Sequence, residues 1–332
     1  MQNKRLFRSL ALLLVFSFVI SLFAGCDTSK ENASDASVTV ITTLFPLFDF
    51  ARVITDGTDA EVSLLLPPGV ESHSFEPSPA DVIAIQRSDV FVYTGDSMET
   101  WAHEIIEGLD GARGTTEDNA FQTVGNTVIA DCSKGIQLDE VEAHDEAEEA
   151  GHNHGNYDPH IWTDPTQAAT MVGTITDALC AADPAHAETY RTNCEAYQAE
   201  LMELDAEFEA LVDGAVRREI CFGGRFALHY FAKRYGLSCI AAYDSCSSET
   251  EPSAKAVAEI TDAILEDGIP VIYYEELVDP KVARSIAEDT GCAMLLLHSC
   301  HNVSKEELID AEGLSHAGKI KPFDLLLHRG EV

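Results

Sequence analysis

Hydrophobic positions along the chain alternate between short β-branched runs and longer segments with helical spacing. Short apolar runs bounded by turn residues predict buried strands, at residues 38–43, 62–66, 90–94, 219–223, 238–243, 271–276 and 293–298. Apolar residues spaced three and four apart predict helices between them, at residues 45–55, 79–88, 227–235, 253–266 and 281–290. Strands that alternate with helices are typical of parallel sheets. The pattern therefore predicts an α/β protein.

One periodic segment is longer than the others. A helix that begins near Asp164 is expected to end at Ala182, before Asp183 and Pro184. The apolar stripe that follows has intervals of three and four residues, through Tyr190, Cys194, Tyr197, Leu201, Leu204, Phe208 and Leu211. A helix over residues 184–211 would be about 42 Å long, more than one small lobe needs. We expect it, with bounds 184–212, to join a lobe at residues 38–183 to a second at 213–332.

The first residues are typical of an export signal. Basic residues at positions 4–8 precede an apolar run at 10–23, which is too short and too one-sided for a settled transmembrane span. Small residues then lead directly to Cys26, as in bacterial lipoprotein signals, so we expect residues 1–25 to be removed and Cys26 to be lipidated. The alternative is an ordinary signal peptide with an ordinary cysteine at 26. Residues 26–37 are polar and suit a flexible tether, which would hold the protein on the outer face of the cell membrane.

The charge of the chain restricts its partners. Acidic residues number 57 against 21 basic ones, which gives a formal charge of -36. Nucleic-acid binding depends on neutralising phosphates with Lys and Arg, so this balance argues against a nucleic-acid partner and favours cations. Residues 139–157 are especially acidic and contain His144, His152 and His154. They are interpreted either as a solvated linker or as a low-affinity collector of cations.

Eight cysteines remain after Cys26. An exported chain permits disulfides, and Cys246 and Cys300, which flank loops after predicted strands, are the best candidates for one bridge. No C-x-x-C pair is present, which argues against a structural zinc site built from cysteines.

Histidines lie at several strand and helix ends, at positions 73, 160, 229, 298 and 301. Ligands of parallel α/β sheets bind beyond the carboxyl ends of the strands, which is where these loops are expected. A single histidine in such a loop is often structural. Histidines delivered by four separate loops favour one shared metal site.

The residues around these histidines resemble a known family. The motifs GVESHSFEPSPAD from Gly69, DPHIWTDP from Asp158 and HYFAKRYGL from His229 are similar to the metal-site motifs of the solute-binding lipoproteins of bacterial zinc and manganese ABC transporters. The stretches SSETEPSAK from Ser247 and HSCHNVSKE from His298 are similar to a Gram-positive branch of that family. The resemblance covers residues 38–312. It implies two Rossmann-like lobes with mainly parallel sheets, joined by a long rigid helix, with the metal in the cleft between them.

The resemblance also implies a set of ligands. His73 and His160 match the first two family ligands, and His229 the third, although the branch with the best-matching motifs often has another residue there. The fourth position falls near residues 299–301, so His301 is predicted, with His298, Glu276, Glu71 or water as alternatives. The sequence from Gly313 onward departs from the family pattern, and we expect a truncated or frameshifted C-terminus that lowers the stability of the second lobe.

Ligand chemistry favours Zn²⁺, because imidazole suits tetrahedral zinc and manganese prefers more oxygen ligands; Mn²⁺ is the alternative. Glu71 and Glu276 could bind the ion or orient a histidine. The neutral imidazoles required would be lost on acidification to about pH 6 or below.

The predicted protein is a monomeric binding protein, not an enzyme, which captures Zn²⁺ and delivers it to an ABC permease and its ATPase. No P-loop is present. The alternative hypotheses are an extracellular metal buffer or adhesin, and a zinc hydrolase. The HExxH motif of zinc metalloproteases is absent from this sequence.

Overall fold

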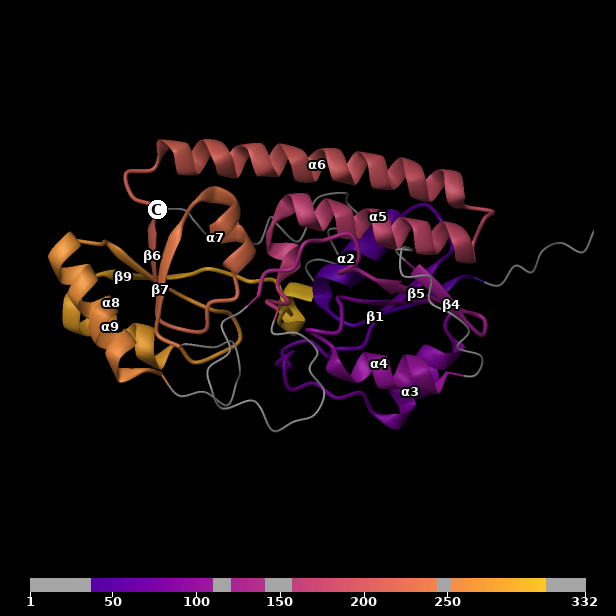
Figure 1. Cartoon of the computed structure of the whole chain (residues 1–332), viewed down its shortest axis with the longest axis horizontal. Coiled ribbons are helices and arrows are strands. Elements are labelled where there is room, and N and C mark those ends of the chain that lie inside the picture. The colour runs from indigo at the N-terminus through magenta and orange to yellow at the C-terminus, as the bar shows by residue number, and fades with distance from the viewer. Residues whose placement is uncertain (1–36, 110–120, 141–156, 244–251, 309–332) are drawn as a thin grey trace, which may run out of the picture. The chain divides into compact units, whose positions relative to one another are not determined.

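The computed structural model describes residues 37–109, 121–140, 157–243 and 252–308 (Figure 1). Several predicted features lie outside the described residues: the predicted export signal, most of the predicted tether, Cys26, the acidic segment at 141–156, Cys246 and the tail from Gly313. The Cys246–Cys300 bridge therefore stays a prediction. No helix within the described ranges is long and apolar enough to cross a membrane.

The first sheet has five strands in the order β2-β1-β3-β5-β4. Its strands are β1 (Thr39–Thr42), β2 (Glu61–Leu64), β3 (Val90–Tyr93), β4 (Phe121–Val124) and β5 (Thr127–Asp131). All pairs are parallel except β4 with β5, which form a hairpin. The two residues between β4 and β5 are Gly125 and Asn126, and Gly125 has φ 62°, a conformation that glycine adopts without strain.

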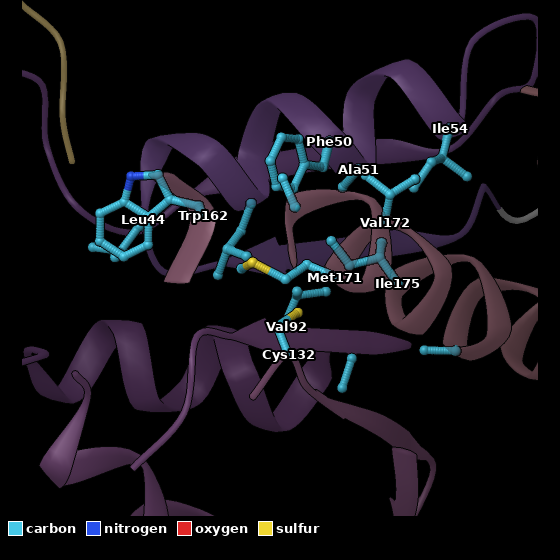
Figure 2. Close-up of a cluster of buried hydrophobic side chains, with 14 of the residues drawn as sticks. Leu44, Phe50, Ala51, Ile54, Val92, Cys132, Trp162, Met171, Val172 and Ile175 are labelled. Carbon is cyan, nitrogen blue, oxygen red and sulfur yellow. The ribbon is translucent and has the colours of Figure 1, made fainter. Parts of the chain in front are cut away.

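Helices cover both faces of this sheet. They are α2 (Phe45–Ile54), α3 (Pro79–Arg87), α4 (Thr100–Gly108), the short 3-10 helix η1 (Ile161–Thr163) and α5 (Pro165–Ala182). Val92 of β3 packs with α2 and α5 in one cluster, whereas its neighbours Phe91 and Tyr93 pack with α3 and α4 in another. Figure 2 shows the first cluster, in which Phe50 of α2 and Met171 of α5 lie near Trp162. The alternation along β3 explains why its run is apolar throughout.

The second sheet has four parallel strands in the order β7-β6-β8-β9. Its strands and helices are β6 (Glu219–Phe222), α7 (His229–Tyr235), β7 (Ser238–Ala241), α8 (Ala254–Asp267), β8 (Val271–Tyr274), α9 (Lys281–Thr290) and β9 (Ala293–Leu296). Cys221 and Ile272 of the sheet pack against Ile260, Ile264 and Ile286 of α8 and α9. The prediction of two α/β lobes with mainly parallel sheets is confirmed.

Helix α6 (Ala187–Gly214) contacts both lobes. Tyr190, Tyr197 and Leu201 join the core of the first lobe, whereas Phe208 and Val212 pack with residues of α7. Leu211, the last residue of the predicted apolar stripe, is 65% exposed, and Val212 is buried in its place, because the α6 residue that packs with α7 after Phe208 lies four positions further on.

The chain returns to the first lobe after β9. We call residues 298–308 the return segment. Cys300 lies in the core cluster of the first lobe, and Val303 is buried against Phe45 and Phe48 of α2. The Gly69 backbone N–H donates to the Val303 carbonyl at 2.9 Å. A segment that follows the second sheet is therefore attached to the first lobe.

Candidate metal centre

His73 lies on the loop between β2 and α3. Pro67 and Pro68 begin this loop with fixed φ angles. The Glu71 carboxylate accepts hydrogen bonds from the backbone N–H groups of His73, at 2.9 Å, and Ser74, at 2.8 Å. Burial would raise the pKa of Glu71, but these hydrogen bonds and the charge of His73 lower it below its ordinary value. Glu71 thus fixes the backbone that carries His73.

His160 is fully buried at the start of η1. Asp158 Oδ1 accepts the His160 backbone N–H at 2.9 Å and lies 2.8 Å from His160 Nδ1. A carboxylate carries no proton, so Nδ1 of His160 is the N–H donor and Nε2 keeps a free lone pair. Burial would raise the pKa of Asp158, but the charge and the hydrogen bonds of His160 lower it. This is the arrangement that holds a metal-binding imidazole in one tautomer.

His301 lies on the return segment. Its Nδ1 is 2.5 Å from Ser299 Oγ, and its Nε2 is buried with no hydrogen-bond partner among the described residues. Burial, followed by the charges of His160 and His73, holds the pKa of His301 well below its usual value. The ring is therefore neutral at physiological pH and one of its nitrogens is unused by the protein.

These three imidazoles lie together. One ligand nitrogen from each of His73, His160 and His301 is within 4.8 Å of the other two. The Nε2 atoms of His73 and His160 are 3.3 Å apart. Two nitrogens on one tetrahedral zinc, at roughly 2.0–2.1 Å each, are separated by roughly 3.3–3.4 Å. The first pair thus already has the separation that zinc requires.

The charge state of His73 also suits a metal. Burial, then the neighbouring charge of His160, lowers the pKa of His73 to about 4. Arg225 acts in the same direction, while the carboxylates of Glu71 and Asp158 oppose it. A neutral His73 can donate its lone pair without first losing a proton.

The structure does not bring His229 to this cluster. His229 is the first residue of α7, its side chain is 48% exposed, and its Nε2 is 3.2 Å from Asp139 Oδ2. The side chain of the neighbouring Tyr230 points toward the protein interior instead, since consecutive helical residues point about 100° apart. The Tyr230 hydroxyl donates to the Asp158 carbonyl at 2.9 Å and accepts the Asp139 backbone N–H at 3.0 Å. Of the predicted residues, His301 rather than His229 joins His73 and His160.

The other predicted candidates lie close by but already have contacts. Glu276 accepts the Ser299 backbone N–H at 2.9 Å and the Ser299 hydroxyl. His298 is buried, and its Nδ1 accepts the Cys300 backbone N–H at 2.9 Å. A hollow of about 110 Å³ borders His73 and His301 and is lined on the second lobe by Arg225, Glu275 and Leu277, among others. Since water occupies about 30 Å³ in the liquid, there is room for a solvent ligand.

Two further residues attach the return segment to the histidine loops. The Asn302 side-chain amide donates to the carbonyls of Pro67 and Val70, both at 2.8 Å. Trp162 Nε1 donates to the Ser299 carbonyl at 2.8 Å, and its ring centroid is 4.9 Å from that of His301. Asn302 was not predicted as a functional residue, because its one signal in the sequence is its place beside His301.

Comparison with known proteins identifies relatives over most of the chain. The family model described as "ZnuA: Zinc-uptake complex component A periplasmic" matches residues 40–311. The high-affinity zinc uptake system protein ZnuA of Bacillus subtilis is 32% identical over 311 residues, which cover 91% of this chain and 92% of that protein. The zinc-binding protein AdcA of Streptococcus pyogenes serotype M3 is 32% identical over 298 residues, which cover 90% of this chain. The chain spans only 57% of the length of that streptococcal relative.

Solved structures share the two-lobed architecture. The metal-dependent lipoprotein YcdH of Bacillus subtilis matches with a TM-score of 0.67 at 31% identity, over 85% of this chain and 97% of that one. Zn(II)-bound AdcA of Streptococcus pneumoniae matches with a TM-score of 0.66 at 27% identity, over 86% of this chain and 55% of that one. The laminin-binding protein Lmb of Streptococcus agalactiae, described as a bifunctional adhesin and metal transporter, has a TM-score of 0.66 at 28% identity, over 85% and 100%.

Proposed function

Because the chain belongs to the family of periplasmic zinc-uptake component A, we propose that it captures Zn²⁺ with His73, His160 and His301 and delivers the ion to a membrane permease. The observation that carries the proposal is the convergence of three imidazoles, from loops far apart in sequence, to within 4.8 Å. His73 and His301 do not need to lose a proton to bind the ion, since burial lowers the pKa of both rings and favours their neutral form.

Zinc is the cargo that these ligands favour. Three imidazole nitrogens and one solvent position make a tetrahedral shell, and the nearest carboxylates, Glu71 and Glu276, already accept hydrogen bonds from backbone N–H groups. Manganese prefers more oxygen ligands than this arrangement offers. AdcA of Streptococcus pyogenes is a zinc-binding protein and ZnuA of Bacillus subtilis belongs to a zinc uptake system, which supports the same choice.

The proposed route follows from the family and the export signal. A lipid on Cys26 would hold the protein, as a monomer, on the outer face of the cell membrane, where the loaded form docks on an ABC permease whose ATPase supplies the energy. The family is one of uptake components, in agreement with the prediction of a binding protein rather than a zinc hydrolase. The adhesin activity described for the Streptococcus agalactiae relative is a property of that protein.

Zinc calorimetry and metal analysis on single alanine variants test the site. We expect His73→Ala, His160→Ala and His301→Ala each to weaken zinc at least about tenfold, or about 1.4 kcal/mol. His229→Ala is the matched control, because it removes an imidazole outside the cluster, and it should bind zinc like the parent. Parental affinity in all three cluster variants would refute the site. A loss in His229→Ala equal to that in His301→Ala would reassign the third ligand.

Uptake of radiolabelled zinc tests delivery. A strain that lacks this chain should take up zinc more slowly at low external concentration, and the parent gene should restore uptake while a His73→Ala copy should not. Adding unlabelled Mn²⁺ as a competitor in the same assay shows whether zinc or manganese is the preferred cargo. Unchanged zinc uptake in the deletion strain would contradict transport and favour a metal buffer.

A further inference from the structure

A loop of the second lobe reaches His301 through one serine hydroxyl. Glu276, two residues after β8, accepts two hydrogen bonds from Ser299: the backbone N–H bonds to Oε2 at 2.9 Å and the hydroxyl to Oε1. The same hydroxyl oxygen lies 2.5 Å from His301 Nδ1. Both the Glu276 and Ser299 side chains are largely shielded from solvent, so water competes weakly for these contacts.

The proton count along this chain of contacts allows one arrangement. A carboxylate can only accept, so the single hydroxyl proton of Ser299 goes to Glu276. The Ser299 oxygen can then only accept from His301, which requires the imidazole proton on Nδ1. His301 Nε2 is left with a free lone pair, and it is the buried nitrogen that has no partner among the described residues.

We propose that Ser299 and Glu276 are positioning residues that hold His301 in the Nδ1–H tautomer needed for zinc, an inference that rests on the proposed function. Asp158 performs this task for His160 by direct contact within the first lobe. His301 differs, because the carboxylate that sets its proton comes from the second lobe while the ring itself sits on the return segment attached to the first. The zinc affinity of the site thus depends on where the second lobe holds Glu276.

Glu276→Gln should invert the tautomer. The Ser299 backbone N–H must be met by an acceptor, so the amide oxygen of the glutamine takes the place of Oε2 and the NH₂ group faces the Ser299 hydroxyl. That hydroxyl then receives a hydrogen bond from the amide and donates its own proton to His301 Nδ1. The ring proton moves to Nε2, and zinc can bind there only after the tautomer changes back.

Glu275→Gln is the matched control. It removes the same charge from the neighbouring position, where the carboxylate lies 3.9 Å from Arg225 and has no hydrogen bond to Ser299. A general loss of negative charge near the ion predicts equal effects in the two variants. The relay predicts that only Glu276→Gln changes the tautomer, and that it weakens zinc by about tenfold or more beyond any charge effect seen in Glu275→Gln.

Nitrogen-15 NMR of the zinc-free protein, with calorimetry of zinc binding, distinguishes the relay from a general loss of negative charge. We expect the Nδ1–H form of His301 in the parent, in Glu275→Gln and in Ser299→Thr, which keeps the hydroxyl, and the Nε2–H form in Glu276→Gln. The Ser299→Ala variant should show a mixture. The same His301 tautomer in Glu276→Gln as in the parent, or Nε2–H in the parent, would overturn the inference even if zinc bound tightly. Weak zinc binding by the parent would instead count against the proposed function.

Discussion

Replacing Asn302 can distinguish a general loss of stability from a specific loss of zinc affinity. It is 1% exposed, and its amide donates to the carbonyls of Pro67 and Val70 on the loop that carries His73. Replacement by alanine removes both donors, so the Val70 carbonyl loses this bond and the Pro67 carbonyl keeps the Val70 backbone N–H, at 3.1 Å. We expect the loop to lose its attachment to the return segment, on which His301 lies.

The size of the effect follows from three hydrogen bonds, because Asn302 Oδ1 also accepts the Val303 backbone N–H at 2.8 Å. Each contributes about 0.5–1.5 kcal/mol net, so Asn302→Ala should lower the free energy of unfolding by about 3 kcal/mol, of which about 2 kcal/mol belongs to the two bonds with the His73 loop. If zinc binding has to restore the full attachment between the loop and the return segment, the zinc affinity falls by as much as about thirtyfold. The zinc-free protein shows the loss of stability directly, and calorimetry shows the loss of affinity.

Asn193 supplies the control. Its amide also donates to two carbonyls, of Ile54 and Asp56, both at 2.9 Å, but at the opposite end of α2 from the return segment. Urea unfolding should show that Asn193→Ala and Asn302→Ala both destabilise the fold. Only Asn302→Ala should weaken zinc. Equal zinc affinities in the two variants, at similar losses of stability, would refute the view that Asn302 joins two ligand-bearing segments.

Three further outcomes are expected. His73 in the zinc-free protein should titrate near pH 4 by NMR, and because this pKa lies below that of the unfolded chain, the free energy of unfolding should fall as the pH drops from 6.5 towards 4; a midpoint near 6.5 would contradict the burial argument. Arg225→Gln should tighten zinc several-fold, since a cation beside a divalent ion costs on the order of 1 kcal/mol; unchanged affinity would mean that its charge is fully compensated. Deletion of residues 141–156 should leave one tightly bound zinc by metal analysis, and its loss would move the site into that segment.

The sequence predicted most of the regular elements and missed one region. Periodicity located the seven strands other than β4 and β5, because each is a short apolar run. Helix α4 was not predicted from the sequence. Only Ala102 and Ile106 of this helix are buried, so its apolar periodicity is weak, and Glu99, before its start, makes no capping bond. Glu99 instead accepts the backbone N–H groups of Thr94 and Gly95. The β4–β5 hairpin did have a signal, the Gly-Asn pair between two runs that contain aromatic and β-branched residues.

The candidate site was predicted in part for a similar reason. His73 and His160 stand in proline-containing motifs with a carboxylate two residues earlier, Glu71 or Asp158, whose local hydrogen bonds help to decide where the ring lies. His229 begins a helix, and which of two neighbouring helical residues faces inward depends on what the helix packs against. Tyr230 faces inward because its hydroxyl satisfies both the Asp158 carbonyl and the Asp139 N–H. The pattern of residues along the sequence does not indicate such long-range contacts.

The return segment explains how a site between two lobes can be largely formed within one. Val303 is fully buried against α2, and Trp162 and Asn302 bond the segment to the loops of His160 and His73. These contacts hold all three imidazoles on the first lobe, so their convergence does not require the second lobe. What the second lobe contributes is Glu276 and the lining of the hollow around Arg225. On the proposed function, movement of the second lobe would therefore alter the proton on His301 and the solvent in the hollow, and leave His73 and His160 in place.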